Sequence, residues 1–419
     1  MNRTLISDRF LEKMSHRYIK NRDIILFSFQ PWNSDIAFNF KDMAYELARY
    51  NRVLFVDRAR DRNSVLKNFL SRSPAYVQVE NAKLEKIQDN FHVLRPKSLL
   101  ESGNWSPNYK LFDFFNRINN KRLAAEIKNA IHTLGFKNSI LINDNDFYRG
   151  LYLKNLVPVR KYIFYIRDFL TIQPFYKKFG PRCEHEMFEK ADLVVANSAY
   201  LAAHAAQWNP NSADIGQGCN LEDFIKDDLK EPEDMKHIPR PIIGYCGALA
   251  SNRLDQELLL HIADNLPEMS LVLVGPPDGN FEKSKLHDRE NVYFLGGKKP
   301  EETASYIQQF TICINPQQVN PLTVGNYPRK IDEYLATGKP VIATATDAME
   351  MFREYACLCY TKEEYVTNIH KMIIDPVLNA PEEKIKRREF ALTHTWENSI
   401  GTLGDAFYQS EKNYKPMEI

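Results

Sequence analysis

The sequence shows no excess of either charge. Its 55 lysine and arginine residues nearly balance 54 aspartate and glutamate residues, which leaves a formal net charge of +1 over 419 residues. Domains that bind nucleic acid usually carry a clear basic excess, because they must neutralise phosphates. We therefore expect no nucleic-acid partner.

Long apolar runs are absent as well. No stretch reaches the roughly 18 consecutive apolar residues of a membrane-spanning helix, and residues 1–23 contain no apolar core of a signal peptide. We therefore expect a cytoplasmic protein. Residues 1–23 mix basic and apolar side chains, which is typical either of an amphipathic helix packed on its own domain or of one on the anionic inner face of the plasma membrane. The basic residues include Arg3, Arg9, Lys13, Arg17 and Lys20.

Cysteine is scarce, and no pair has the spacing of a redox or zinc motif. In the tightest pair, Cys357 and Cys359, only one residue separates the two thiols. We therefore expect reduced thiols, mostly buried in apolar strands, rather than disulfides or metal ligands. The six cysteines are Cys183, Cys219, Cys246, Cys313, Cys357 and Cys359.

Short β-branched runs alternate with longer helical patterns along almost the whole chain. This rhythm predicts βαβ units on parallel sheets that helices cover on both faces. It occurs in two series, and 419 residues exceed what one core usually serves. The fold class we expect is therefore α/β, with two doubly wound, Rossmann-like domains facing across a cleft. The expected strands lie within 23–29, 52–57, 139–144, 162–168, 191–198, 241–249, 269–276, 291–297, 311–316 and 340–344.

The domain boundary should fall in the charged, proline-containing segment 226–241. We expect an N-terminal domain over 1–228, a C-terminal domain over 229–398, and a final helix within 399–419 that can cross back to the first domain. Ligands of open parallel sheets bind beyond the carboxyl ends of the strands. Candidate residues at those ends could therefore line one cleft.

The stretch "PRKIDEYLATGKPVIAT" (328–344) places two cations at the start of an expected helix. A structural helix favours cations at its other end, because its N-terminus is already positive. Arg329 and Lys330 therefore suggest a bound anion such as a diphosphate. Thr323 and Gly325 precede them in a loop suited to the same anion, and Glu333 could bind the ribose hydroxyls. The alternative for Glu333 is an i,i+4 ion pair with Arg329.

A second candidate loop follows the strand at 241–249. Gly247 allows a tight turn or a close approach of the backbone to a ligand. Arg253, six residues later, could bind a phosphate with two hydrogen bonds. The alternative is a plain β-turn with a solvated arginine.

Several segments resemble GT-B glycosyltransferases, in particular the family-4-like enzymes of bacterial surface polysaccharide assembly. The segments are "KIDEYLATGKPVIAT", "EKADLVVANSAYLAAHAAQWNPNSADIGQGCNLEDF", "NVYFLGGKKPEETASYIQQFTICINP" and "FALTHTWENSI", within residues 185–405. "YIRDF" in the first half is similar to the teichuronic-acid-type transferases. The resemblance implies transfer of a sugar from a nucleotide diphosphate sugar, UDP preferred, to a saccharide or lipid-linked acceptor, without a cofactor.

The resemblance also implies roles for single residues. It assigns Glu333 to the donor ribose, and Lys330 and Arg253 to the diphosphate. The chain departs from the family pattern at Ala248, where the family has an arginine, and at Gly325, where it has a glutamate that helps to position the donor sugar. These departures leave the donor sugar and the retaining or inverting course open.

Asp168, at the end of the strand "YIFYIRD", is the candidate catalytic carboxylate, with Arg167 beside it. The alternative is a helix cap. The triplet "DND" at 144–146 resembles a metal-binding motif, but we expect a metal-independent reaction in which cations stabilise the leaving phosphate.

The loop "QPWNSDIAF" is the candidate acceptor site. It offers an aromatic ring for stacking on a sugar and small polar groups for hydrogen bonds, although Ser34 or Asp35 could instead cap the next helix. The candidate acceptor residues are Trp32, Asn33, Ser34 and Asp35.

Two other functions fit the same scaffold. One is a nucleotide-sugar epimerase or hydrolase. The other is a catalytically inactive nucleotide-binding subunit, which the glycine at position 325 favours.

Overall fold

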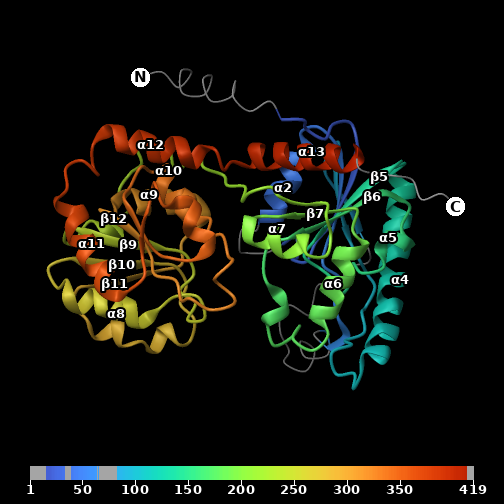
Figure 1. Cartoon of the computed structure of the whole chain (residues 1–419), viewed down its shortest axis with the longest axis horizontal. Helices are drawn as coiled ribbons and strands as arrows, with labels where there is room; N and C mark the ends of the chain where they lie inside the picture. The colour runs from blue at the N-terminus through green and yellow to red at the C-terminus, as the bar shows by residue number, and fades with distance from the viewer. Residues whose placement is uncertain (1–15, 34–38, 64, 66–82, 413–419) are drawn as a thin grey trace. The chain divides into compact units, whose positions relative to one another are not determined.

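The structure is a computed structural model that describes residues 16–33, 39–63, 65 and 83–412. Its contacts divide the chain into two compact units. Unit 1 contains the described residues up to Gly218 and those from Trp396 onward, and unit 2 runs from Cys219 to Thr395. Each unit is a sheet with helices packed on its faces (Figure 1), so the two α/β domains expected from the sequence are confirmed.

Unit 1 is built on an eight-stranded sheet in the order β3-β4-β2-β1-β5-β6-β7-β8. Neighbouring strands are parallel, apart from the antiparallel edge pair β3 and β4. All positions of β1 and β5 are buried, as expected for central strands covered on both faces. The strands are β1 (Asp23–Phe27), β2 (Arg52–Val56), β3 (Lys83–Gln88), β4 (Phe91–Arg95), β5 (Ser139–Asp144), β6 (Val159–Ile166), β7 (Leu193–Ala196) and β8 (Ser212–Asp214).

Two helices of unit 1, α4 and α7, begin at residues whose side chains cap them. The Asn108 side chain accepts a hydrogen bond from the Leu111 N–H at the start of α4, and Gly135 ends α4 with φ 61°. Ser198 caps α7 in the same way as Asn108 caps α4. The helices are α2 (Asn39–Ala48), α4 (Tyr109–Leu134), α5 (Leu153–Leu156), α6 (Gly180–Lys190), α7 (Ala199–Ala206) and α13 (Trp396–Lys412).

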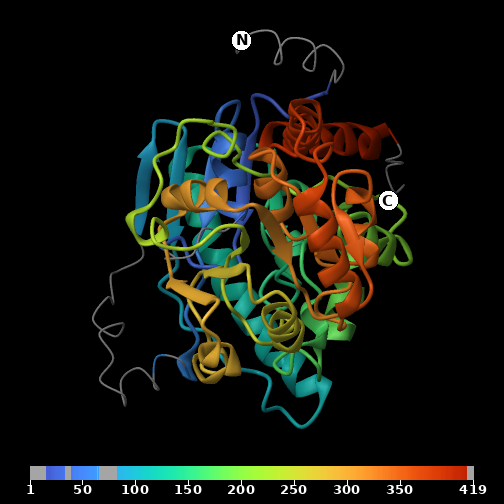
Figure 2. The ribbon, with the colours of Figure 1, turned by 90° about the vertical axis from the view of Figure 1, so that its left-hand side faces the viewer.

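Helix α13 returns to unit 1 and fills part of its core. It lies beside α2 in both views (Figures 1 and 2). A Cβ on Gly404 would lie 2.0 Å from the Arg17 carbonyl oxygen, so this helix approaches the N-terminal segment closely because it has glycine there. The side chains that α13 adds to the core are Trp396, Ile400, Leu403 and Phe407.

Unit 2 is built on a six-stranded, fully parallel sheet in the order β11-β10-β9-β12-β13-β14. Its central strand β9 is buried at every position. The strands are β9 (Ile242–Cys246), β10 (Ser270–Val274), β11 (Val292–Gly296), β12 (Ile312–Asn315), β13 (Val341–Thr344) and β14 (Cys357–Cys359).

Two apolar clusters, one on each face of this sheet, form the core of unit 2. Helices α9, α10 and α12 lie with one cluster, and α8 and α11 with the other. The helices are α8 (Gln256–Asn265), α9 (Thr303–Gln309), α10 (Lys330–Ala336), α11 (Lys362–Ile374) and α12 (Pro381–Leu392).

The units divide earlier than the expected boundary at 228/229, and the last helix starts before 399. The Cys219 N–H donates to the His394 carbonyl at 3.0 Å, and Leu221 and Phe224 pack into the core of unit 2. The charged segment expected to link the domains is instead a surface connection of unit 2, where Asp227 pairs with Arg388 at 2.7 Å. The boundary lies before the charged segment because the apolar residues that precede this segment already pack into unit 2.

Among the described residues, no helix combines the length and the apolar character required to cross a bilayer.

Candidate functional site

Tyr334 ties α10 to the carboxyl end of β9. Its buried hydroxyl accepts a hydrogen bond from the Cys246 N–H at 2.8 Å and donates to the Cys246 carbonyl at 3.2 Å. Lys330 lies one helical turn before Tyr334, so the two side chains share a face of α10. The hydrogen bonds of Tyr334 therefore place Lys330 at the end of β9.

Lys330 lies over the turn that follows β9. A Cβ on Gly247 would be 3.2 Å from Nζ and 3.0 Å from Cε of Lys330, and Gly247 has φ 147°, which favours glycine. The ammonium group also lies 5.0 Å from the centre of the Tyr245 ring. The structure thus brings together two of the residues that the sequence assigned to the donor.

The turn after β10 meets the turn after β9 backbone to backbone. Gly275 has φ 148°, and a Cβ there would lie 1.9 Å from the Gly247 carbonyl oxygen. A side chain at position 275 would not fit between these two turns. The backbones of the two turns are therefore in direct contact at this edge of the sheet.

Glu333 forms the ion pair that the sequence offered as its alternative role. Its Oε1 lies 3.0 Å from Nε of Arg329, and the two side chains are 16% and 30% exposed, respectively. The structure thus brings Arg329 and Glu333 together, and binding of ribose by Glu333 stays a prediction.

Lys330 and Glu333 are both within electrostatic reach of the end of β9. The pKa of the Cys246 thiol is raised to about 12, mainly by burial and also by the charge of Glu333, while the charge of Lys330 opposes the rise. One charge of each sign therefore lies near the last residue of this strand.

Arg253 lies on the loop that follows β9, which packs beside the loop that follows β12. The Arg253 carbonyl accepts a hydrogen bond from the Gln318 N–H at 2.8 Å, and Leu254 and Gln317 form an isolated bridge. The two loops that the sequence assigned to the donor are therefore in direct contact.

Thr323 faces the inside of its own loop, contrary to the expectation that it would meet the donor. It is fully buried, and its hydroxyl accepts from the Asn320 N–H at 3.0 Å and donates to the Gln318 carbonyl. Thr323 thus shapes the loop. Gly325 is also buried.

Asp332 is a structural centre of unit 2 that the sequence analysis missed. Its fully buried carboxylate accepts hydrogen bonds from the Tyr327 hydroxyl at 2.8 Å and from the Cys219 thiol at 3.5 Å, and it lies 2.8 Å from Nδ1 of His394. Burial raises the pKa of Asp332 in spite of these partners. The acidic pattern of the helix gave no sign of which carboxylate points inward.

In unit 1, both aspartates of the "DND" triplet pair with arginine. Asp144 is fully buried and meets Arg167 through two contacts, at 2.6 and 3.1 Å. Asp146 lies 2.5 Å from Nε of Arg149. In the part of the chain that the structure describes, no group of three or more His, Cys, Asp or Glu side chains is placed to hold a metal ion.

Asp168 follows β6 and is partly exposed. Its carbonyl accepts from the Asn145 side chain at 2.9 Å and from the Leu170 N–H at 2.9 Å. The short helix η2 (Leu170–Ile172) begins after Phe169, whose side chain forms no capping hydrogen bond. The role of Asp168 toward an acceptor stays a prediction.

Trp32 is only 5% exposed and is part of the core of unit 1. Its ring lies 4.9 Å from that of Phe55 and 5.5 Å from that of Phe91. The expectation that it stacks on a sugar is therefore wrong, because the run of apolar strands buries this ring. Asn33 is exposed, whereas Ser34 and Asp35 lie outside the described residues.

Comparison with known proteins identifies the domain that carries Lys330. Residues 240–375 match the family model described as glycosyl transferases group 1. Unit 2 carries a group 1 glycosyltransferase domain. The match confirms the resemblance seen in the sequence of this half of the chain.

One curated relative is similar over a longer stretch. TuaH of Bacillus subtilis, whose name provisionally assigns it to teichuronic acid biosynthesis as a glycosyltransferase, is 28% identical over 242 residues. This match covers 54% of the chain and 59% of TuaH, so the chain spans about six-tenths of the relative's length.

Solved structures confirm the GT-B fold around the group 1 domain. Sucrose-phosphate synthase from Thermosynechococcus elongatus has a TM-score of 0.67 at 18% identity, covering 94% of this chain and 100% of that one. Anabaena Alr3699/HepE in complex with UDP has a TM-score of 0.62 at 14% identity, with the same coverage. Trehalose 6-phosphate synthase from Burkholderia multivorans has a TM-score of 0.65 at 9% identity, again with the same coverage.

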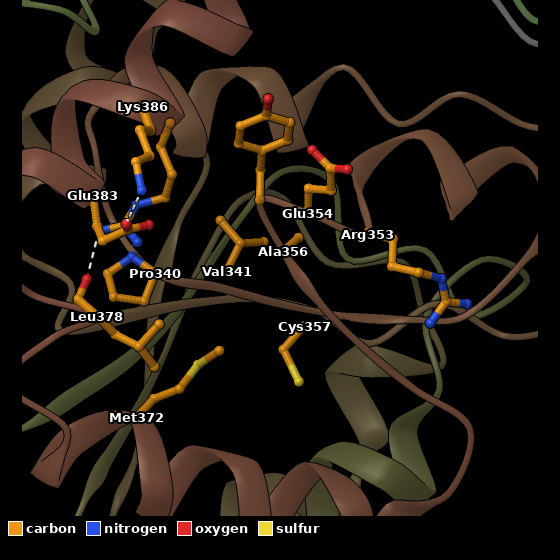
Figure 3. Close-up of a pocket in the computed structure, with 12 residues that line it drawn as sticks. Pro340, Val341, Arg353, Glu354, Ala356, Cys357, Met372, Leu378, Glu383 and Lys386 are labelled. Atoms are coloured by element: carbon orange, nitrogen blue, oxygen red, sulfur yellow. Dashed lines mark hydrogen bonds and ion pairs between the residues drawn. The ribbon is translucent and has the colours of Figure 1, made fainter.

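A cavity of about 390 Å³ lies at the other end of the sheet in the group 1 domain (Figure 3). Its lining includes Pro340 and Val341 at the start of β13, and Ala356 and Cys357 at the start of β14. In parallel sheets ligands bind at the carboxyl ends of strands. This cavity is therefore separate from the candidate donor site around Lys330.

Proposed function

We propose that the chain is a glycosyltransferase that moves a sugar from a nucleotide diphosphate sugar, with UDP preferred, to a saccharide or lipid-linked acceptor in the assembly of a surface polysaccharide or another glycan. The observation that carries the proposal is the position of Lys330 over Gly247, at the carboxyl end of β9 and inside the group 1 domain. Two of the similar structures are complexes of Anabaena Alr3699/HepE, one with UDP and one with UDP-glucose, which supports the choice of donor. The proposal places the protein in the cytoplasm, at the inner face of the plasma membrane when the acceptor is lipid-linked.

In the proposed reaction, the bond between the anomeric carbon and the diphosphate breaks while an acceptor hydroxyl attacks. Negative charge grows on the departing diphosphate, and the enzyme must stabilise it. Lys330 supplies a cation at that place, and Arg253 lies on the same β9 loop. Glu333 binds the ribose of the donor while Arg329 orients its carboxylate.

We further propose that the reaction needs no metal ion and no cofactor. In many sugar-nucleotide sites a metal ion offsets the charge of the diphosphate, and here side-chain cations have that role. The pairing of Asp144 with Arg167 and of Asp146 with Arg149 supports this, since both carboxylates already have a positive partner.

The test is incubation of the purified full chain with a panel of UDP- and GDP-sugars, with and without saccharide acceptors. We expect nucleotide release that depends on an acceptor, together with a glycosylated product. Nucleotide release without an acceptor would identify a hydrolase, and a changed sugar still attached to its nucleotide would identify an epimerase. Tight UDP binding without turnover for any pair would identify the inactive subunit that Gly325 suggests.

A further inference from the structure

A second pocket lies in unit 1, at the carboxyl ends of its strands. It has a volume of about 310 Å³. Its lining comes from the segment after β2, which carries Arg58, the segment after β5, which carries Asp146, Tyr148 and Arg149, and helix α4, which carries Asn116. This is the edge of a parallel sheet at which substrates bind.

Two arginines meet at this pocket. The guanidinium carbon atoms of Arg58 and Arg149 lie 5.8 Å and 5.7 Å from the centre of the same ring, that of Phe29. Burial lowers the pKa of Arg58, and the charge of Arg149 lowers it further; nearby acidic groups, Asp146 first, oppose this. Arg149 pairs with Asp146. The lining therefore combines the guanidinium groups of Arg58 and Arg149 with the carboxylates of Asp61, Glu101 and Asp146. Of the two guanidinium groups, that of Arg58 has no carboxylate of the described residues within ion-pair distance.

Unused hydrogen-bonding atoms line the same pocket. The Tyr148 hydroxyl and the Asn116 amide nitrogen are buried and form no hydrogen bond with any described residue. The two residues are 8% and 4% exposed. Buried polar groups normally have a partner, because an unpaired one has lost its hydrogen bonds to water without replacement. A hydroxyl and an amide NH₂ without partners, beside two guanidinium groups, suit a ligand rich in oxygen atoms.

Asparagine side chains of α4 next to these atoms, in contrast, form hydrogen bonds to the backbone around the pocket. Asn120, one turn of α4 after Asn116, donates to the Tyr148 carbonyl at 3.1 Å and accepts from the Tyr152 N–H at 3.0 Å. Asn119 bonds the backbone of Glu101 in both directions, at 2.8 and 2.9 Å. The pocket is therefore held in shape by its surroundings while its inner donors stay unused.

Aromatic rings form one wall of the pocket. The rings of Tyr148 and Tyr176 lie 5.2 Å apart, and that of Phe175, which is 57% exposed, lies 4.8 Å from Tyr176. Apolar ring faces beside a few polar groups are typical of small-ligand sites. They give the apolar face of a sugar ring a surface on which to lie.

We propose that this pocket binds an acidic sugar of the acceptor, with Arg58 and Arg149 holding its oxyanion and Tyr148 and Asn116 bonding its other oxygens. The inference rests on the proposed transferase activity and narrows its acceptor class. Planar guanidinium groups match a carboxylate or a phosphoryl group with paired hydrogen bonds. The oxyanion is therefore either the carboxylate of a uronic acid or the phosphoryl group of a sugar phosphate.

The experiment titrates the full chain at low ionic strength with glucuronate, glucose 6-phosphate and glucose, followed by ligand-observed NMR. UDP is titrated in parallel by calorimetry. We expect at least one acidic sugar to bind about tenfold or more tightly than glucose, since charged hydrogen bonds are the strong ones. Preference for glucuronate assigns a uronic acid, and preference for glucose 6-phosphate assigns a sugar phosphate.

Variants test whether the acidic sugar binds in this pocket. Arg58→Ala should remove the preference for the acidic sugar and leave UDP affinity unchanged, while Arg117→Ala, which removes an exposed arginine of α4, should leave both unchanged. Tyr148→Phe should weaken binding of the acidic sugar without lowering the melting temperature, because its hydroxyl forms no hydrogen bond with a described residue. A merely structural tyrosine would not show that combination.

The inference is overturned if neither acidic sugar binds more tightly than glucose, or if Arg58→Ala and Arg117→Ala have equal effects. Failure of the transferase proposal looks different. In that case UDP does not bind and no sugar is transferred, while binding of the acidic sugar still depends on Arg58.

Discussion

Lys330 occupies the space that a side chain on Gly247 would need. The Cβ of an alanine at position 247 would lie 3.0 Å from Cε of Lys330, and the backbone φ of 147° would be strained for any residue with a Cβ. The glycine and the lysine are 83 residues apart in sequence, yet they define one local geometry.

Lys330→Ala should lower turnover by a factor of about 100 or more, because a cation that stabilises the departing diphosphate is lost. Steady-state kinetics at saturating donor measure this effect. Lys362→Ala, which removes an exposed lysine of α11, is the control and should leave turnover unchanged. Equal turnover for Lys330→Ala and the wild type would disprove the assigned role of Lys330.

Gly247→Ala should reduce donor binding and turnover together, because the added Cβ forces Lys330 to move. Calorimetry with UDP and the kinetic assay report the two effects. Gly279→Ala is a suitable control, since a Cβ there would meet no atom within 4 Å. An active Gly247→Ala enzyme would show that the close approach of Lys330 has no part in the reaction.

Glu333→Ala should weaken UDP binding about ten- to a hundredfold, since hydrogen bonds to a charged group contribute roughly 1.5–3 kcal/mol. The melting temperature should change little, because a partly exposed i,i+4 pair contributes only about 0.3–0.5 kcal/mol. Calorimetry and a thermal melt measure the two quantities.

Arg329→Ala separates the two roles of Glu333. It breaks the same ion pair but leaves the carboxylate in place. If Arg329→Ala and Glu333→Ala weaken UDP binding equally and both lower the melting temperature strongly, Glu333 is a structural partner and not a ribose ligand.

Activity should survive an excess of chelator, because the expected counter-charge consists of side chains. The assay is repeated with EDTA and then with added manganese. Complete loss of activity that manganese reverses would redirect attention to Asp144 and Asp146.

Tyr334→Phe should lower the free energy of unfolding of unit 2 by about 1–3 kcal/mol, because the buried Cys246 N–H loses its partner. It should also reduce turnover, since the link that places Lys330 is lost. Denaturant unfolding measures the first effect, with Tyr360→Phe, whose ring is 69% exposed, as the control. A loss of stability without any change in turnover would show that Lys330 is positioned by other contacts.

Cys357 should react with iodoacetamide before the other five cysteines. It is partly exposed, while the others are buried. Hydrogen bonding with Cys359 lowers the pKa of Cys357 to about 7, and the thiolate is the reactive form. Its rate of alkylation should therefore rise as the pH passes through about 7, which peptide mass spectrometry can follow. First reaction at a buried cysteine would contradict this order.

Much of the fold could be predicted from the sequence because its central strands are continuous apolar runs. β1 and β9 are buried along their whole length. A short continuous apolar run is typical of a central strand in a parallel sheet that is covered on both faces. The edge pair β3 and β4 could not be predicted in this way. β3 reads "KLEKIQ" and none of its residues is buried, so it lacks the apolar pattern on which the prediction depended.

The proximity of Gly247 and Lys330 agrees with the sequence-based expectation that both lie at one edge of a parallel sheet, Gly247 directly after β9 and Lys330 at the start of α10 between β12 and β13. Their role toward a donor stays a prediction. Trp32 was misjudged because an aromatic residue in a loop can turn either outward or into the core, and the core strands decide which. Arg58 and Arg149 were missed because 91 residues separate them, and only the packing of the loops beyond β2 and β5 brings them to one pocket.

The return of α13 to unit 1 has a consequence for biosynthesis. Unit 2 is one uninterrupted segment, so a ribosome can release all of it before the last helix emerges. Until then unit 1 lacks the apolar side chains of α13, including Trp396 and Phe407, that complete its core. During synthesis, unit 2 can therefore complete its folding before unit 1 does. A chain that ends before Trp396 would leave exposed the apolar surface of unit 1 that α13 covers, and chaperones and proteases could bind there.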